Sequence, residues 1–349
     1  MQARMRDRIV LLWAISVLVP AGAAGEVRIN EKLHLSGTLR VQWSDTEGRE
    51  GRDGFETRLA RLVAGFQMNA HISGRISVEL ASGECAQNSD LLDAYARWQP
   101  NPRTIVSLGQ QLMPAFYDLR TSLPQHDALE LPTVVNTYFR GRRGRGVYVE
   151  HQLNSQSRAL IGVWNSLTIR DPQLNERGGE ARMMALLAVR RDHEQVRFNI
   201  GALWGRRPGF LSRIAPNNLI NVPEVDRRVL YGEVEIHPAG LRPLTLRWTS
   251  LAGRDRNPAG GLSNPQFLSP SNYTAQIGYV IYNLRSNHRL TLRWEEFDPD
   301  TARRNDSVRV LGIFLHFFPE PGVRLTAGYE WVDASEGRNR AYFAAQFQF

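Results

Sequence analysis

AYFAAQFQF, residues 341–349, ends the chain in an alternation with a period of two. Alternate side chains of an extended strand point to opposite faces, so one face of this stretch carries only Ala and Phe. An apolar face that finishes on an aromatic carboxyl-terminal residue is typical of the closing strand of a bacterial outer-membrane β-barrel. The stretch therefore predicts an all-β transmembrane barrel in the outer membrane. The residues of the apolar face are Ala341, Phe343, Ala345, Phe347 and Phe349.

The amino-terminal segment has the pattern of an export signal. Three arginines precede an apolar run from Ile9 to Val19, and a proline with small residues follows up to Ala24. This run is shorter than the roughly 17–25 residues of a membrane-spanning helix, so we expect residues 1–24 to be a cleaved signal peptide. The barrel is then expected to occupy residues 25–349.

Composition argues against several other classes of protein. Cys85 is the only cysteine, so the chain cannot form an internal disulfide, and the eight histidines show no metal-binding spacing. Without residues 1–24, which carry three arginines and Asp7, the net charge falls from +8 to +6. Nearly all of the positive charge is arginine, because Lys32 is the only lysine. We expect no cofactor, no metal and no nucleic-acid partner.

The period of two recurs along the whole chain. It is clearest at 33–43, where apolar residues from Leu33 to Trp43 alternate with polar ones over a length that spans the hydrocarbon layer when the strand is tilted. Sixteen such segments can be counted, although fourteen or eighteen strands remain compatible with the pattern. An even count places both ends of the barrel at the periplasmic rim. The predicted strands are 33–43, 55–68, 72–81, 91–99, 104–112, 145–153, 158–166, 180–190, 196–204, 228–237, 243–251, 273–283, 288–297, 307–317, 322–332 and 341–349.

The connections and tryptophans support this arrangement. Connections after even-numbered strands are of turn length, and most of those after odd-numbered strands are longer, as expected for short periplasmic turns and long extracellular loops. Tryptophans near the long-loop ends of strands predict an aromatic girdle at the membrane boundary, with Trp98 at a short-turn end. The long-loop tryptophans are Trp43, Trp164, Trp204, Trp248, Trp294 and Trp331.

Positions that alternate with the lipid-facing residues are rich in arginine. Guanidinium groups stay charged, so a set of them inside the barrel should attract anions and repel cations. The alternative is that each arginine pairs with a carboxylate inside the barrel, but arginines outnumber acids on this face. We expect the pore-lining, anion-binding residues to be Arg40, Arg58, Arg75, Arg97, Arg182, Arg197, Arg247, Arg289, Arg293 and Arg324.

The longest connection, 113–144, has features of a loop that folds into the lumen. It contains three prolines and an apolar stretch at Leu129–Val135, and a loop of this length without structure of its own is usually functional. We expect it to narrow the pore, with a basic cluster at the constriction or its mouth. A solvated basic loop that binds lipopolysaccharide phosphates is the alternative. The arginines of the cluster are Arg140, Arg142, Arg143 and Arg145.

Catalytic patterns are weak. His34 and Ser36 share a strand face, as do Glu233 and Glu235, but same-face polar pairs arise automatically in a polar-lined barrel. We therefore expect no catalytic residues and no enzymatic activity.

Motifs between residues 56 and 150 point to one family. They are Arg58–Leu62, Leu92–Tyr95, Leu108–Gln110 followed by Pro114–Phe116, and Gly141–Val147. Together with the closing strand, they resemble the phosphate-selective porin O and P family. The resemblance implies a sixteen-stranded, commonly trimeric porin with an arginine-lined channel. Phosphate specificity in the family is associated with lysines as well as arginines.

We interpret the chain as an outer-membrane porin through which small inorganic or organic anions diffuse. Its expected partners are outer-membrane lipid, lipopolysaccharide and two further copies of itself in a homotrimer. A barrel that serves mainly as a structural sheath or binding partner, with little conductance, is the second hypothesis. A soluble exported β-protein is the third, and the aromatic end and girdle count against it.

Overall fold

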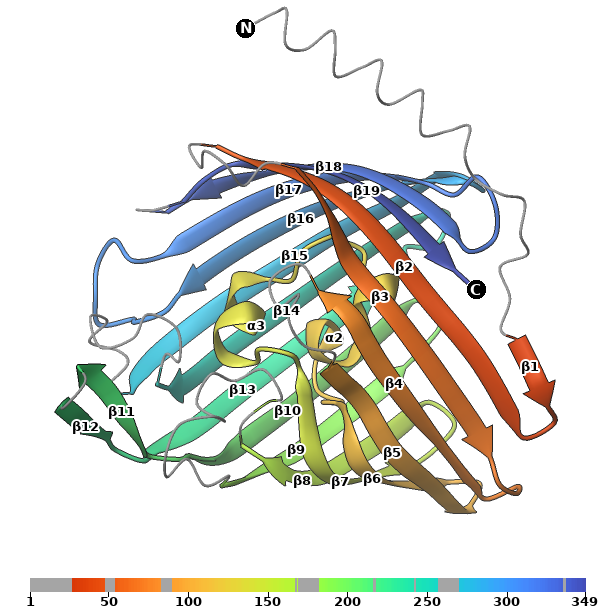
Figure 1. Ribbon diagram of the computed structural model, residues 1–349, viewed down its shortest axis with the longest axis horizontal. Coiled ribbons are helices and arrows are strands. Elements are labelled where there is room, and N and C mark those ends of the chain that lie inside the picture. Colours follow the sequence, from red (N-terminus) through yellow and green to blue (C-terminus); the bar gives the residue numbers. More distant parts are fainter. Residues whose placement is uncertain are drawn as a thin grey trace, which may run out of the picture.

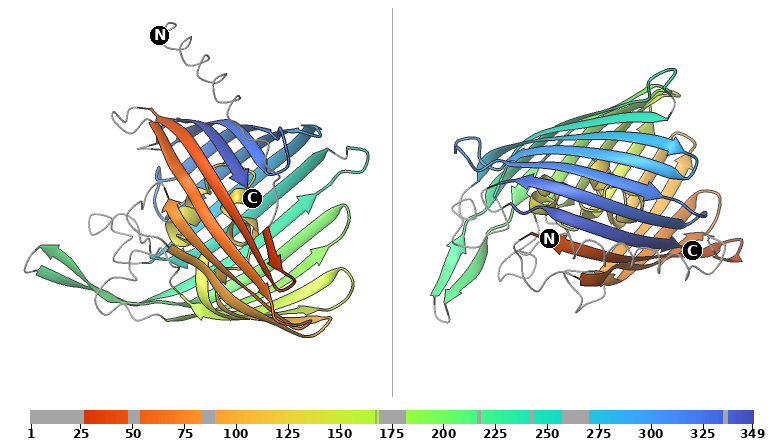
Figure 2. Two further views of the ribbon diagram at one scale, coloured as in Figure 1. Left: turned by 45° about the vertical axis from the view of Figure 1, so that its right-hand side comes forward. Right: turned by 90° about the horizontal axis from the view of Figure 1, so that it is seen from above.

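A computed structural model describes residues 27–47, 54–82, 90–166, 168, 182–215, 218–241, 243–256, 270–334 and 337–349. Sixteen antiparallel strands close into a barrel, and each pairs with its neighbours in the chain until the last meets the first (Figures 1 and 2). The predicted signal peptide lies outside the described residues. So does Cys85. No helix in the described ranges is long and apolar enough to cross a membrane.

The barrel strands follow the predicted ones closely. They are β2 Leu33–Thr46, β3 Gly54–Gln67, β4 Ile72–Ser82, β5 Asp90–Asn101, β6 Thr104–Leu112, β7 Arg143–Gln152, β8 Ser157–Asn165, β9 Met183–Asp192, β10 Val196–Arg207, β13 Val225–Ile236, β14 Leu244–Asp255, β15 Ser271–Arg285, β16 His288–Asp298, β17 Val308–Phe317, β18 Val323–Asp333 and β19 Arg340–Gln348. The sixteen-stranded fold class predicted from the sequence is therefore confirmed.

Three further strands were not predicted. β1, Val27–Asn30, pairs with the start of β2, while β11, Phe210–Ala215, and β12, Asn218–Val222, form a hairpin in the long connection between β10 and β13. This hairpin projects from one rim of the barrel (Figure 1). Short segments of this kind carry too few alternating residues to stand out in the sequence.

Side chains alternate between the two faces of the wall. Along β2, Leu35 and Leu39 are exposed on the outer face, whereas Thr38, Arg40 and Gln42 are buried on the inner face. In a membrane protein an exposed outer position contacts lipid, so apolar residues there are stable, and the polar partners turn toward the interior.

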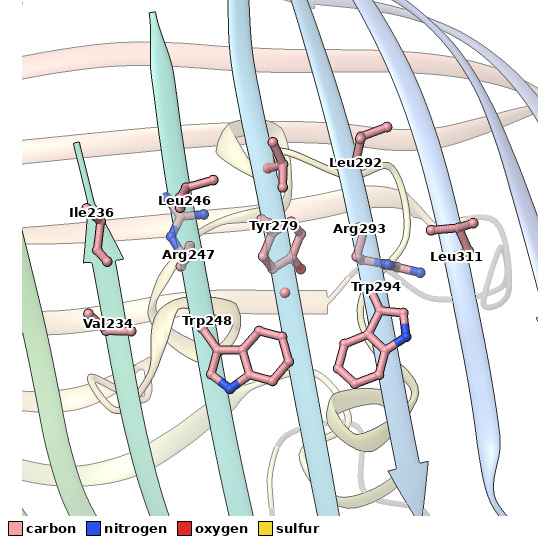
Figure 3. Close-up of a pocket in the computed structure, with 12 residues that line it drawn as sticks. Val234, Ile236, Leu246, Arg247, Trp248, Tyr279, Leu292, Arg293, Trp294 and Leu311 are labelled. Carbon is pink, nitrogen blue, oxygen red and sulfur yellow. The ribbon is translucent and has the colours of Figure 1, made fainter. Parts of the chain in front are cut away.

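Most tryptophans lie on the outer face. Trp98, Trp204, Trp248 and Trp331 are exposed there. Trp248 and Trp294 stack with ring centroids 5.2 Å apart, one on each side of Gly278, whereas Arg247 and Arg293 precede them on the opposite face (Figure 3). This pair lies within its strands rather than at their ends.

Trp164 departs from the predicted girdle. It is fully buried on the inner face of β8 and stacks on Tyr148. The glycines of the basic motif make room for it, because a Cβ at Gly144 or at Gly146 would lie 2.9 Å from the indole. The girdle assignment of Trp164 is therefore wrong, because this part of the inner wall is itself apolar.

Residues 113–142 lie inside the barrel between β6 and β7 (Figure 1). Prolines divide the segment, since Pro124 lies in the short 3₁₀ helix η2, Leu123–Gln125, and Pro132 precedes helix α3, Thr133–Tyr138. Helix α2, Tyr117–Arg120, begins just after Pro114. We call residues 113–142 the inserted segment.

Candidate functional site

The inserted segment packs its apolar side chains against one part of the barrel wall. Phe116, Leu119, Val134, Val135 and Phe139 are completely buried. They belong to one cluster with inward side chains of β7 to β10, β13 to β17 and β19. Fully burying one such side chain contributes about 1.5–3 kcal/mol, so this packing holds the segment inside the barrel.

Aromatic pairs join the segment to this wall. Tyr138 of α3 stacks on Tyr273 of β15, with ring centroids 4.2 Å apart and an interplanar angle of 19°. The ring centroids of Phe116 and of Tyr231 on β13 lie 5.6 Å apart. These inward aromatics explain why part of the lumen wall is apolar even though a barrel interior is usually polar.

Arginines of the wall also bind the inserted segment, largely at backbone carbonyls. Arg40 donates to Leu123 O at 3.0 Å, Arg324 donates to His126 O at 3.0 Å, and Arg293 donates to Glu130 O. Arg40 and Arg324 also share the side-chain oxygen of Gln346, at 2.6 and 2.9 Å.

Two acidic residues of the inserted segment bind further wall arginines. Asp127 lies 3.0 Å from Arg247 and 3.2 Å from Arg289, and Glu130 lies 2.9 Å from Arg58. Six of the ten arginines predicted to line the pore thus contact the inserted segment. We call these six the clamp arginines: Arg40, Arg58, Arg247, Arg289, Arg293 and Arg324.

A buried hydrogen-bonded group lies at the centre of the segment. Asp118 accepts hydrogen bonds from His126 Nε2 at 2.8 Å and from Tyr279 OH at 2.6 Å, and all three side chains are buried. Burial lowers the pKa of His126 below its ordinary value, although the hydrogen bond to Asp118 opposes the shift. Burial raises the pKa of Asp118, but the hydrogen bonds from His126 and Tyr279 outweigh this and leave it lowered.

The predicted basic cluster is divided among different environments. Arg142 is buried and donates to Asp118 O and Thr121 O within the inserted segment. Arg143 begins β7 and pairs with Asp93 at 2.8 Å, and Arg145, on the same strand, donates to Gln110 at 2.8 Å. The carbonyl of Arg140 accepts a hydrogen bond from Thr168. The structure therefore does not gather these four side chains at one place.

A polar cavity lies beside the inserted segment inside the barrel. Its volume is about 310 Å³, and it is bounded by inward residues of β4 to β10 and by Pro114 to Gln125. We call this cavity the vestibule. Arg75 and Arg97, both predicted from the sequence, line it together with Arg120, Arg158 and Arg190.

The remaining predicted arginines lie elsewhere. Arg197 is half-exposed inside the barrel and pairs with Glu235 at 3.0 Å. Arg182 lies just before β9 and pairs with Glu224 at 2.6 Å.

Several arginines that face the interior were not among the site residues predicted from the sequence. Arg61 is buried and pairs with Glu79 at 2.9 Å. It lies beyond a β-bulge that shifts the register of β3 against β2, so Arg58 and Arg61 both turn inward although three positions separate them. The bulge changes which face each residue occupies, and strict alternation could not find both.

A buried cluster of charged residues near the long-loop rim was also not predicted from the sequence. Asp255 lies 2.8 Å from Arg207 and 2.9 Å from Arg227, and all three side chains are fully buried. Arg227 also donates to Tyr138 O of α3 and to Ser166 O. The cluster therefore ties the inserted segment to β13 and β14.

Comparisons with known proteins agree with the fold. Residues 37–191 match the family model of phosphate-selective porin O and P. This match confirms the resemblance seen in the sequence motifs. No curated protein matches this sequence.

Solved outer-membrane porins share the architecture at low sequence identity. An anion-selective porin from Comamonas acidovorans superimposes with a TM-score of 0.66 at 11% identity, covering 91% of this chain and 99% of that one. The outer-membrane channel DcaP of Acinetobacter baumannii gives 0.65 at 12%, covering 94% and 100%. The trimer form of OmpT from Vibrio cholerae gives 0.64 at 12%, covering 91% and 99%. At these identities the likeness establishes the porin fold.

Proposed function

We propose that this chain, whose residues 37–191 match the phosphate-selective porins, is an outer-membrane channel through which small anions diffuse. The observation that carries the proposal is the charge of the vestibule. Its five arginines and the neighbouring Arg143 face four carboxylates, those of Asp93, Glu150, Asp192 and Glu233. Two positive charges are left without a matching carboxylate among the described residues.

Selectivity would follow from the field of these arginines. A cleft with low-dielectric walls and an excess of one charge concentrates counter-ions and repels ions of its own sign. Guanidinium groups stay charged over the whole physiological pH range, and they replace part of the hydration of an anion by hydrogen bonds. A small anion would therefore pass more readily than a cation of similar size.

The inserted segment would set the width of the path. It occupies part of the lumen, so solutes would pass beside it through the vestibule, which is bounded by β4 to β10. We infer that the clamp arginines mainly fix this segment, whereas Arg75, Arg97 and the other vestibule arginines act on the solute.

The arginine content favours general anion preference over phosphate specificity. Lys32 is the only lysine of the chain, and it lies in the turn between β1 and β2, away from the vestibule. We therefore propose that phosphate is one of several anions that pass rather than the single substrate. By analogy with the trimeric porins of this fold, we further propose a homotrimer embedded in outer-membrane lipid and lipopolysaccharide.

A second candidate is a barrel of low conductance that serves as a sheath or binding partner. The number of hydrogen bonds that hold the inserted segment favours it, because a firmly held segment reduces the open cross-section. Conductance in planar bilayers distinguishes the two. With a KCl gradient, the channel should conduct and its reversal potential should report anion preference, whereas the absence of conductance would support the sheath.

A further inference from the structure

Arg75 and Arg97 differ from the other vestibule arginines in their partners. Arg158 lies 2.7 Å from Glu150, Arg190 lies 3.0 Å from Asp192, and Arg120 lies 2.6 Å from Glu233. By contrast, Arg75 is 3.7 Å from Asp93, which Arg143 already holds at 2.8 Å. Arg97 lies 5.6 Å from the centre of the Tyr95 ring, and no described carboxylate pairs with it.

The register of β4 and β5 places these two arginines near each other. Arg75 pairs with Tyr95 and Ser73 pairs with Arg97, so Arg75 and Arg97 are diagonal neighbours on the same face. Such neighbours are about 7–8 Å apart, within reach of long side chains. The Nε atoms of both arginines are buried without a hydrogen-bond partner among the described residues. Two guanidinium groups at this spacing can hold one carboxylate between them.

The vestibule also has an apolar side. Leu112, Pro114 and Leu160 line it together with the arginines, and Tyr148 adds an aromatic ring. Gln111 and Asn199 also line the cavity, and each has a buried side-chain atom without a hydrogen-bond partner among the described residues.

Size favours an organic ligand. The volume of about 310 Å³ lies at the lower end of the range for pockets that bind small organic molecules. A lone oxyanion held by Arg75 and Arg97 would leave the apolar side in contact with water only.

We propose that the vestibule binds small organic carboxylates, with the carboxylate between Arg75 and Arg97 and the carbon skeleton against Leu112, Pro114 and Leu160. This proposal rests on the proposed anion channel and names its solute class. Binding on the path of the ions would slow their passage, so a bound carboxylate should reduce the current carried by chloride.

The test compares benzoate, acetate and inorganic phosphate as blockers of chloride current in planar bilayers. Benzoate should reduce the current at concentrations at least tenfold lower than acetate or phosphate. Arg97→Gln should weaken the block by benzoate about tenfold or more. Arg197→Gln is the matched control, because it removes an inward charge that does not line the vestibule, and it should change the block by benzoate less than threefold.

Calorimetry on the detergent-solubilised protein measures the same binding without requiring current. The carboxylate site would be overturned if benzoate and phosphate blocked the current equally, or if both substitutions weakened the block by benzoate equally. A reversal potential that indicates anion preference would still support the channel in that case. A protein that conducts nothing yet binds benzoate in an Arg97-dependent manner would retain the site and remove the channel. Absence of benzoate binding in calorimetry overturns the proposal whatever the conductance.

Discussion

The ring of Phe349 covers Gly37 on the outer face of the barrel, where the last strand meets the first. The two residues also exchange both backbone hydrogen bonds, since Gly37 N donates to Phe349 O and Phe349 N donates to Gly37 O. A Cβ on Gly37 would lie 2.5 Å from the ring, so only glycine leaves the space that the ring occupies. The aromatic end is therefore part of the seam that closes the barrel.

Deleting Phe349 should impair closure of this seam. The variant loses the ring over Gly37 and both backbone hydrogen bonds of residue 349, so we expect unfolded chain in the periplasm and little heat-modifiable barrel in the outer membrane. Gel mobility of unheated samples measures this. Gly37→Val, which forces the ring away, should destabilise the barrel by about 1–3 kcal/mol in urea unfolding. An unchanged outer-membrane yield after deletion would contradict the role of the seam.

Removing residues 120–138 should raise single-channel conductance, because the inserted segment occupies the lumen. The deletion also leaves Arg247, Arg289 and Arg293 without their partners in the segment, so anion preference should increase. Conductance and reversal potential from the same bilayer recordings measure both effects. Unchanged conductance would mean that the segment does not limit the path.

Replacing clamp arginines should loosen the inserted segment. Arg40→Gln and Arg324→Gln each remove a charged hydrogen bond to a carbonyl of the segment, a contact that contributes about 1.5–3 kcal/mol. The population of detached states should rise about tenfold to a hundredfold and increase current fluctuations in single-channel recordings. Arg309→Gln is the control, since Arg309 is exposed on β17 and hydrogen-bonds to Glu296. Fluctuations as small as those of the control would argue against the clamp.

Vestibule arginines should control selectivity more strongly than clamp arginines. Replacing Arg75 and Arg97 with Glu should shift the reversal potential toward cation preference, most clearly at low salt where screening is weak. The substitutions leave the lipid-facing side unchanged, so the barrel should still fold. Retention of the original reversal potential by the folded double variant would exclude these arginines as the source of selectivity.

Acid should weaken the attachment of the inserted segment through His126. Its pKa is lowered in the folded protein, so below about pH 6.5 the detached segment binds a proton that the attached one does not, and stability falls as pH falls. The lowered pKa of Asp118 acts in the same direction at lower pH. The other groups that face this pair are Tyr117, Asp127, Arg142, Arg247, Tyr279 and Arg324. Current fluctuations should therefore grow between pH 7 and pH 5, and His126→Gln should reduce this dependence. Identical pH profiles for both proteins would contradict it.

The sequence by itself determined the sixteen strands of the barrel. Lipid on one side of the wall and a polar interior on the other require a two-residue alternation, and this requirement acts on each strand locally. Segments such as 33–43 and 288–297 therefore correspond closely to β2 and β16. The closing strand and the family motifs could also be recognised in the sequence, because each is a pattern of residues that are neighbours in the chain.

Only the tertiary structure decided which inward arginines contact the inserted segment and which line the vestibule. Arg247 and Asp127 lie 120 positions apart in the chain, and Arg293 meets the carbonyl of Glu130 across 163 positions. Trp164 was misplaced because apolar residues also face inward where the segment packs, and Arg61 was missed because a bulge shifts the register. Alternation in the sequence indicates which residues avoid water, but lipid and a packed protein segment exclude water equally well. Only the path of residues 113–142 through the lumen shows which apolar residues face lipid and which face this segment.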